Sequence, residues 1–157
     1  MKHSISTIGY EGATIEAFVA KLQRASIDLI IDVRDLPLSR KKGFSKNQLA
    51  EILMSFDIEY VHLKGLGDPR DGRMAARAGD YGLFQKIFGK HLKTDIALKH
   101  MDIAAGLVRD RSACLMCFEA DPAQCHRSIV ASRLAQMTGL TVTPLAVQDS
   151  RISRIAA

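Results

Sequence analysis

Chemically capable side chains gather in one short stretch of the chain. Glu119 ends an apolar run, and Cys125, His126 and Arg127 follow soon after it at consecutive positions. A thiol near a helix N-terminus and beside cationic groups has its thiolate form favoured, which is typical of a reactive cysteine. The helix amides and Arg127 are also suited to hold a phosphate or carboxylate without covalent chemistry. In a third, structural interpretation Cys125 is a small buried residue and Arg127 pairs with Glu119 or Asp32.

Glu119 stands at the end of a predicted strand, where burial raises the pKa of a carboxyl group and suits it to acid or base chemistry. The alternative for this residue is an ion pair with Arg127 or Arg34. A carboxylate in such a place is costly without a task or a partner. We therefore predict Glu119 as a catalytic acid or base, with Cys125 and His126 as the other catalytic residues.

Zinc binding is an alternative role for the cysteines. Cys114 and Cys117 have the spacing of a zinc knuckle, but an odd separation within a strand points the two thiols to opposite faces. Cys117, Cys125 and His126 are able to converge on one ion together with Glu119. We predict no cofactor and no metal ligand, and keep zinc as the alternative.

A second set of polar residues follows the predicted strand at 29–34. Asp32 and Arg34 share one face of that strand, either as ligand contacts or as an ion pair. The loop after them contains Ser39, Arg40 and the densest positive charge of the chain, which suits contact with phosphate. The predicted ligand-binding residues are Gly9, Tyr10, Asp32, Arg34, Ser39, Arg40 and Arg127.

Two cysteine chemistries are excluded by spacing. Cysteine-dependent phosphatases carry an arginine at a fixed distance after the nucleophile, where this chain has Ala123 and Ala131. Sulfurtransferases of the rhodanese type share the look of Ile31–Arg34, but no cysteine here is followed by their basic residue. Both resemblances fail at the nucleophile.

The elements that must position these residues alternate along the chain. Apolar runs predict strands at 4–10, 29–34, 58–63, 113–118 and 140–147, the last of them an edge strand because it contains Pro144. Periodic apolar residues predict helices at 14–25, 45–56, from 83 onward, at 95–110, and from 121 or 125 to 138. Residues 64–80, with Arg70, Arg73 and Arg77, are predicted to be an irregular connection, either a lid that closes over the crevice or a disordered segment.

This order predicts an α/β fold: a single domain at 1–150 with a mostly parallel five-stranded sheet and helices on both faces. Residues 151–157 are predicted to be a loose C-terminal tail. In a parallel sheet the carboxyl ends of the strands share one edge, so the polar residues at those ends should form one crevice.

The net charge, the apolar runs and the cysteine count of the chain indicate which kinds of partner to expect. The net charge of +5 and the pI near 9.3 favour anionic partners. No apolar run approaches the roughly 18 residues of a membrane span, and the start of the chain lacks a signal-peptide pattern, so we expect no membrane partner. Three cysteines are an odd count, which argues against disulfides and for a cytoplasmic location. The sequence makes no prediction of oligomeric state.

Several short motifs occur in a fixed order. They are Thr7–Tyr10, Asp32–Arg34 with Pro37, Ser39-Arg40 and Phe44-Ser45, Leu66-Gly67, Cys117–Glu119 and Cys125–Arg127. Together they resemble the bacterial domain-of-unknown-function family four-eight-eight. The resemblance implies no established activity. It marks as signature residues Gly9, Tyr10, Asp32, Arg34, Pro37, Ser39, Arg40, Glu119, Cys125, His126 and Arg127.

The leading hypothesis is that the strand ends bind a phosphate-bearing ligand, a nucleotide or nucleic acid, and act on it as a hydrolase or transferase. One alternative is a non-enzymatic module that binds nucleic acid through the basic loop. A second alternative is a zinc-dependent hydrolase.

Overall fold

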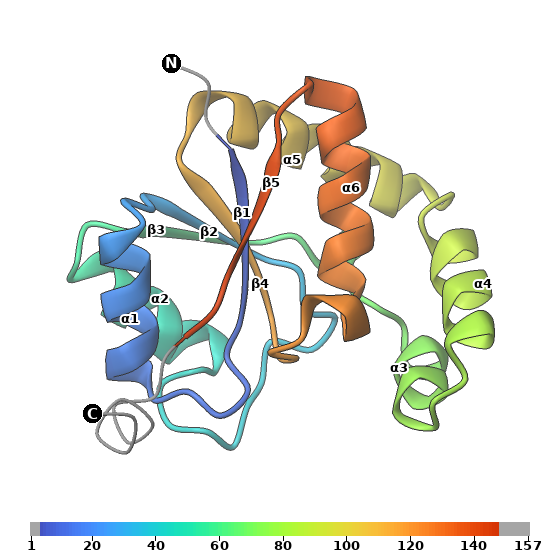
Figure 1. Ribbon diagram of the computed structural model, residues 1–157, viewed down its shortest axis with the longest axis horizontal. Helices are drawn as coiled ribbons and strands as arrows, with labels where there is room; N and C mark the ends of the chain where they lie inside the picture. Colours follow the sequence, from blue (N-terminus) through green and yellow to red (C-terminus); the bar gives the residue numbers. More distant parts are fainter. Residues whose placement is uncertain (1–3, 148–157) are drawn as a thin grey trace.

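The protein is built around one five-stranded sheet, seen in a computed structural model that describes residues 4–147 (Figure 1). The strands are β1 (Ile5–Gly9), β2 (Leu29–Asp32), β3 (Glu59–His62), β4 (Ala113–Cys117) and β5 (Val142–Leu145). They lie in the order β3-β2-β4-β1-β5, and each pairing is parallel. The predicted α/β fold is confirmed, whereas the predicted tail at 151–157 lies outside the described residues.

Burial explains which segments form the sheet. Every residue of β1, β2 and β4 is buried, as expected for parallel strands covered on both faces. The edge strands β3 and β5 are partly exposed. Pro144 has no N–H to donate to a neighbouring strand, and it lies in the edge strand β5, as predicted.

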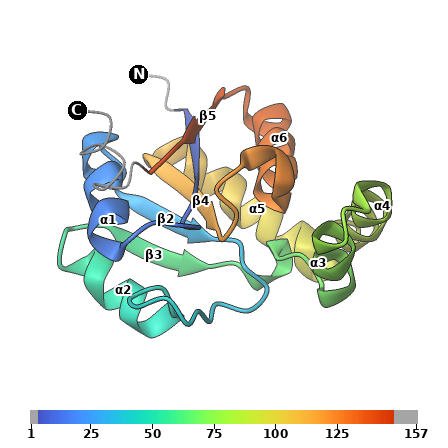
Figure 2. The same cartoon turned by 60° about the horizontal axis from the view of Figure 1, so that its bottom comes forward.

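Helices cover both faces of the sheet (Figures 1 and 2). α1 (Ile15–Arg24) and α2 (Lys46–Met54) pack on one face, and α4 (Tyr81–His91), α5 (Asp95–Asp110) and α6 (His126–Thr138) pack on the other. Right-handed crossovers cause this division, because the chain crosses the sheet in one direction from β1 to β3 and in the other from β3 to β5. Within residues 4–147, none of the helices has the length and apolarity needed to cross a membrane.

Each face of the sheet has its own hydrophobic core. Cys114 belongs to the core beneath α1 and α2, with Phe18 and Phe44. Cys117 belongs to the core beneath α4, α5 and α6, with Phe88. The two thiols therefore point to opposite faces, as their odd spacing predicts.

The connection from β3 to α4 departs from the prediction. The irregular loop expected at 64–80 is wrong, because the segment contains a 3-10 turn, η1 (Lys64–Leu66), and a helix, α3 (Arg70–Arg77). The buried face of α3 consists of Gly72 and Ala75. It lacks the large apolar residues by which an amphipathic helix is recognised in a sequence.

Two histidines and one arginine fix this connection against the rest of the protein. Nδ1 of His100 accepts a hydrogen bond from the backbone N–H of Gly65 at 2.8 Å, and Nε2 of His91 lies 2.8 Å from the Gly65 carbonyl oxygen. Arg73 of α3 forms an ion pair with Asp35, which follows β2, at 2.9 Å. These contacts hold α3 beside the C-terminal edge of the sheet.

Candidate functional site

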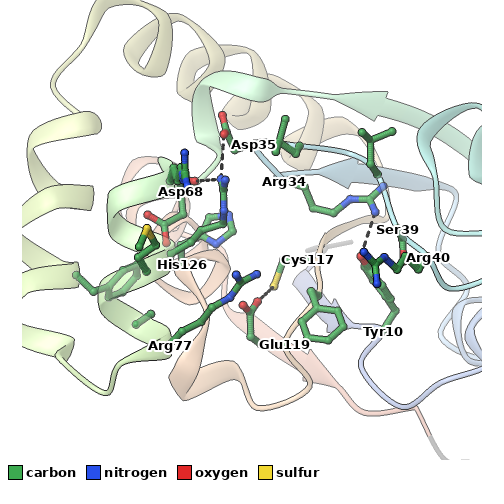
Figure 3. A pocket seen from close by; sticks show the side chains of 18 residues that line it. Tyr10, Arg34, Asp35, Ser39, Arg40, Asp68, Arg77, Cys117, Glu119 and His126 are labelled. Atoms are coloured by element: carbon green, nitrogen blue, oxygen red, sulfur yellow. Dashed lines mark hydrogen bonds and ion pairs between the residues drawn. The ribbon is translucent and has the colours of Figure 1, made fainter.

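The topology creates a crevice at the C-terminal end of β4. This strand lies between β1 and β2, and the helices that follow β1 and β2 pack on the opposite face from α6, which follows β4. Chain segments therefore diverge on both sides of β4, and open α/β sheets bind ligands at such points. A cleft of about 740 Å³ opens there (Figure 3). Its walls come from the ends of β1, β2 and β4 and from α3.

The structure brings all ten predicted site residues to this crevice. Tyr10, Arg34, Ser39, Arg40, Glu119 and His126 line the cleft. Gly9, Asp32, Cys125 and Arg127 are buried and contact lining residues from behind. The arrangement separates side chains that can reach a ligand from those that support the wall.

Gly9 supports the site by allowing two backbone segments to meet. A Cβ atom at this position would lie 1.7 Å from the carbonyl oxygen of Glu119 and 2.5 Å from its carbonyl carbon. Any larger residue would therefore push the chain that carries Glu119 outward. Gly9 acts on the cleft by positioning Glu119.

Asp32 and Arg34 form a buried ion pair, with Nη2 and Oδ2 2.8 Å apart. The hydroxyl of Tyr60 donates a further hydrogen bond to Asp32 at 2.5 Å. Nη1 of Arg34 donates to the carbonyl oxygen of Phe44 at 2.7 Å and to the hydroxyl of Tyr10 at 3.2 Å. Most of the guanidinium donors are thus used within the protein, and the main effect of Arg34 is to fix the wall of the cleft.

Arg127 is completely buried beneath the chain that follows β4. Its Nη1 donates to the carbonyl oxygen of Glu119, and its Nη2 donates to that of Ala120 at 3.2 Å. Nη1 also lies 3.0 Å from Sγ of Cys117. The guanidinium therefore faces backbone carbonyls and does not line the cleft.

Ser39 shapes the loop that presents Arg40. Its Oγ accepts a hydrogen bond from the backbone N–H of Lys41 at 3.0 Å, and its backbone N–H and carbonyl both bond to Oγ of Ser45 at 3.1 Å. Nζ of Lys41 donates to the carbonyl oxygen of Ala13 at 2.8 Å. This folding turns Lys41 onto the body of the protein and leaves Arg40 exposed at the cleft.

Three exposed arginines supply positive charge at the cleft. Arg40, Arg70 and Arg77 line it, and none of them forms an ion pair within residues 4–147. Arg70 and Arg77 are two helical turns apart on α3 and so share one face of that helix. Arg77 points toward Glu119 (Figure 3). The three cations come from two walls and remain available to an anionic ligand.

Asp68 is a cleft residue that the sequence analysis missed. It is 4% exposed, and its Oδ1 has no hydrogen-bond partner in the described part of the chain. Burial raises the pKa of its carboxyl to about 7, and the nearby carboxylates of Glu119 and Asp35 add to the shift while Arg73 opposes it. Asp68 lies just before α3, in the segment that was predicted from the sequence to be an irregular loop. Its only sequence signal is the Leu66-Gly67 motif directly before it.

Cys117 and Cys125 are joined, with their sulfur atoms 2.08 Å apart. This disulfide contradicts the expectation of unpaired cysteines, since the turn after β4 brings together two residues that lie in different elements. Cys125 is the N-cap of α6, and its Sγ accepts from the backbone N–H of Arg127 at 3.4 Å. The later of the two predicted helix starts is therefore confirmed, and Asp121 instead caps a short 3-10 turn, η2 (Pro122–Gln124).

His126 is held in one orientation at the base of the cleft. Its Nε2 lies 2.6 Å from the carbonyl oxygen of Val33, which can only accept, so Nε2 carries the hydrogen. Nδ1 therefore has a free electron pair, and it lies 3.6 Å from Sγ of Cys125. Burial lowers the pKa of His126 to about 4, which keeps the imidazole neutral at neutral pH.

Glu119 stands beside this group. Burial raises the pKa of its carboxyl, as the sequence analysis expected, and its Oε2 lies 3.4 Å from Sγ of Cys117. Neither of the predicted ion pairs with Arg127 and Arg34 forms among the described residues. Arg127 instead bonds the backbone carbonyl of Glu119.

The rim of the cleft also has an apolar part. Leu36, Leu38, Met74 and Phe118 line the cleft and are exposed. Phe118 packs edge-on against Tyr10, with the ring centroids 5.4 Å apart. Apolar and aromatic side chains next to free arginines favour a ligand that has both a flat or apolar portion and an anionic one.

The sequence was also compared with known proteins. The sequence model of the family described as domain of unknown function DUF488 matches residues 14–134, which is more than half of the chain. The chain belongs to this family. The DUF488 match includes eight of the ten predicted site residues and stops short of Gly9 and Tyr10. Comparisons with curated proteins and with solved structures gave no match.

Proposed function

We propose that the cleft binds a phosphate-bearing ligand of about nucleotide size. The observation that carries this proposal is the convergence of Arg40, Arg70 and Arg77 on one concave site without ion-pair partners in the described residues. Guanidinium groups bond phosphate oxygens in pairs, which gives both affinity and orientation. The positive net charge of the protein adds attraction at longer range.

The size and the apolar rim of the cleft support the same class of ligand. A volume of about 740 Å³ lies within the range of about 300–1,000 Å³ that is typical of small-molecule sites. Phe118 and Leu38 are exposed at its rim, where a base or another flat group can pack against them. A free phosphate ion alone would leave this surface uncovered.

Asp68 and Glu119 are the groups that would move protons on such a ligand, in hydrolysis or in group transfer. Asp68 borders the cleft, and its Oδ1 has no hydrogen-bond partner among residues 4–147. Burial brings its pKa to about 7, so near neutral pH the carboxyl can both accept and return a proton. Asp68 is therefore the stronger acid or base candidate of the two.

The test is thermal unfolding of the protein with a panel of ligands. The panel holds orthophosphate, ribose 5-phosphate, the four ribonucleoside 5′-monophosphates and a short single-stranded oligonucleotide. A ligand that binds only the folded state raises the unfolding temperature in proportion to the logarithm of its excess over Kd. We expect a nucleotide to raise it more than ribose 5-phosphate, and ribose 5-phosphate more than orthophosphate.

Variants connect the shift to the cleft. Arg77→Ala and Arg70→Ala should each weaken binding by about 10-fold to 100-fold. This is the effect of losing a contact to a charged group that contributes about 1.5–3 kcal/mol. Arg24→Ala is the matched control, because Arg24 is an exposed arginine in the last turn of α1 and does not line the cleft. Equal weakening in all three variants, or no shift for wild-type protein, would reject the proposal. A shift produced by the oligonucleotide alone would instead favour a nucleic-acid-binding module.

A further inference from the structure

We propose that Cys117, Cys125 and His126 form a zinc site when the disulfide is reduced. One ligand atom from each residue lies within 4.8 Å of the others, and all three residues are buried. This inference concerns the floor of the cleft and does not depend on the phosphate-bearing ligand. Thiolates and imidazole are the usual protein ligands of Zn²⁺, which binds them in tetrahedral geometry.

The distances suit a single tetrahedral ion. With Zn–S bonds of about 2.3 Å and a Zn–N bond of about 2.0–2.1 Å, two ligand atoms of one ion lie roughly 3.5–3.8 Å apart. Nδ1 of His126 is already 3.6 Å from Sγ of Cys125. The Cα atoms of Cys117 and Cys125 are 7.4 Å apart. After reduction, this separation leaves room for their sulfur atoms to bind one ion from two sides.

The orientation of the His126 ring also supports metal binding. Its Nε2–H is used by the carbonyl oxygen of Val33 at 2.6 Å, so the electron pair on Nδ1 faces the two cysteines. Histidines that bind metals usually donate their other ring hydrogen to a carbonyl or carboxylate in this way, which fixes the tautomer and the ring.

The surrounding charges are balanced for a bound dication. Two thiolates neutralise Zn²⁺, and Cys117 has one acidic and one basic neighbour: its Sγ lies 3.4 Å from Oε2 of Glu119 and 3.0 Å from Nη1 of Arg127. Binding to two thiols releases two protons for each ion. Cys117 and His126 also line the cleft, so a fourth position on the ion would face it, as in zinc sites with three protein ligands.

Oxidation and metal binding exclude each other at this site. Reduction of the disulfide by a phosphine gives two thiols and the phosphine oxide, with water supplying the oxygen atom and the two hydrogens. Only the thiols can then lose their protons to the ion. Protein that keeps the disulfide should therefore bind no zinc here.

The test begins with wild-type protein reduced by a phosphine and freed of metal. Titration with Co²⁺ should produce thiolate-to-cobalt charge-transfer absorption that saturates at one equivalent, and Zn²⁺ should remove that absorption. X-ray absorption at the zinc edge should show about two sulfur ligands at about 2.3 Å and nitrogen or oxygen ligands at about 2.0–2.1 Å. This readout needs no variant. A ligand shell without sulfur, or no charge-transfer band, would overturn the proposal.

Variants then assign the ligands. Cys125→Ser and His126→Gln should each weaken Zn²⁺ binding by more than about a hundredfold, since even the loss of an outer hydrogen-bond partner costs about 10–100-fold. Cys114→Ala is the matched control, because it removes a buried thiol on the opposite face of β4. Circular dichroism verifies that each variant is folded. Zinc binding that survives Cys125→Ser, or that is lost in Cys114→Ala, would contradict the assignment.

Discussion

The carboxyl group of Asp68 is the most unusual single group in the cleft. It is buried, one of its oxygen atoms has no hydrogen-bond partner within the described residues, and three exposed arginines line the cleft around it. A carboxyl in such a place resists ionisation, because the charged form loses its hydration without gaining a hydrogen bond. Its titration should therefore be visible in the stability of the whole protein.

We expect the free energy of unfolding to fall as the pH rises from about 4 to about 8. The folded-state pKa of Asp68 is about 7, above its ordinary value of 3.8, so the folded protein holds this proton more tightly than the unfolded chain does. The resulting stabilisation is complete below the lower pKa and is lost as the pH rises through the higher one. Asp68→Asn should remove the effect, gaining about 1–3 kcal/mol on wild type across this range in urea denaturation.

Asp71→Asn is the control for this measurement, since Asp71 is an exposed carboxyl in the first turn of α3. It should keep the wild-type difference between the two pH values. Parallel curves for wild type and Asp68→Asn would show that Asp68 titrates as an ordinary surface group.

The sequence predicts which residues lie near the cleft better than it predicts which of them are free to contact a ligand. Glu119, His126 and Arg40 could be placed at the cleft because residue type and position at a strand end are both visible in the sequence. The ion pair between Asp32 and Arg34 was one of the two alternatives that their spacing predicted. The bonds from Arg34 to the Phe44 carbonyl and from Arg127 to the carbonyls after β4 could not be predicted, because they depend on which backbone oxygens packing brings within reach. Asp68 was missed for a related reason: its burial comes from α3, which the sequence pattern concealed.

At the scale of elements, α3 controls the position of Asp68. A Cβ atom at Gly72 would lie 2.0 Å from Oδ1 of Asp68, so any larger residue at this position would have to displace the carboxyl group. Replacing glycine by alanine inside a helix ordinarily stabilises it by about 1 kcal/mol. At position 72 the displaced carboxyl should cancel that gain.

We therefore expect Gly72→Ala to give no net stabilisation and to reduce the pH dependence attributed to Asp68. Urea denaturation at two pH values measures both effects. Gly89→Ala is the control, because Gly89 is in α4 and nothing lies within 4 Å of its added Cβ; this variant should gain about 0.5–1 kcal/mol. An equal gain in the two variants would mean that α3 and Asp68 are not coupled.

The order of most elements along the chain and the parallel direction of the strands were predictable, since buried parallel strands are continuous apolar runs and the helices between them are amphipathic. α3 was not predictable in this way, because its buried surface consists of Gly72 and Ala75. These small residues let the helix backbone pack closely, and no large apolar side chains mark its buried face in the sequence. The disulfide between Cys117 and Cys125 was not predictable either. It depends on a turn that reverses the chain between β4 and α6, and the number of cysteines in the chain does not predict that turn.

At the scale of the whole molecule, the cleft joins segments that are distant in sequence. Its walls come from the loop after β2, from α3 and from the turn after β4. A ligand that contacts all three should slow amide hydrogen exchange in 35–45, 70–77 and 117–125 together, because opening any one wall would cost binding energy. Mass spectrometry of exchange with the most stabilising nucleotide measures this.

Amide hydrogen exchange in the last turns of α1 is the internal reference for that experiment, because these turns lie at the N-terminal end of the strands, away from the cleft. Its rate should be unchanged by the ligand. Protection confined to a single wall would place the ligand outside the cleft.

The position of β5 has a consequence for how the protein is made. All residues that line the cleft lie between Tyr10 and His126, so a ribosome releases the whole cleft before it releases β5 (Val142–Leu145). Until then β1, a buried and apolar strand, has an unpaired side that only β5 covers among the described residues. A nascent chain released as far as α6 therefore holds every residue that lines the cleft while one side of β1 is still uncovered, and that side can pair with another chain.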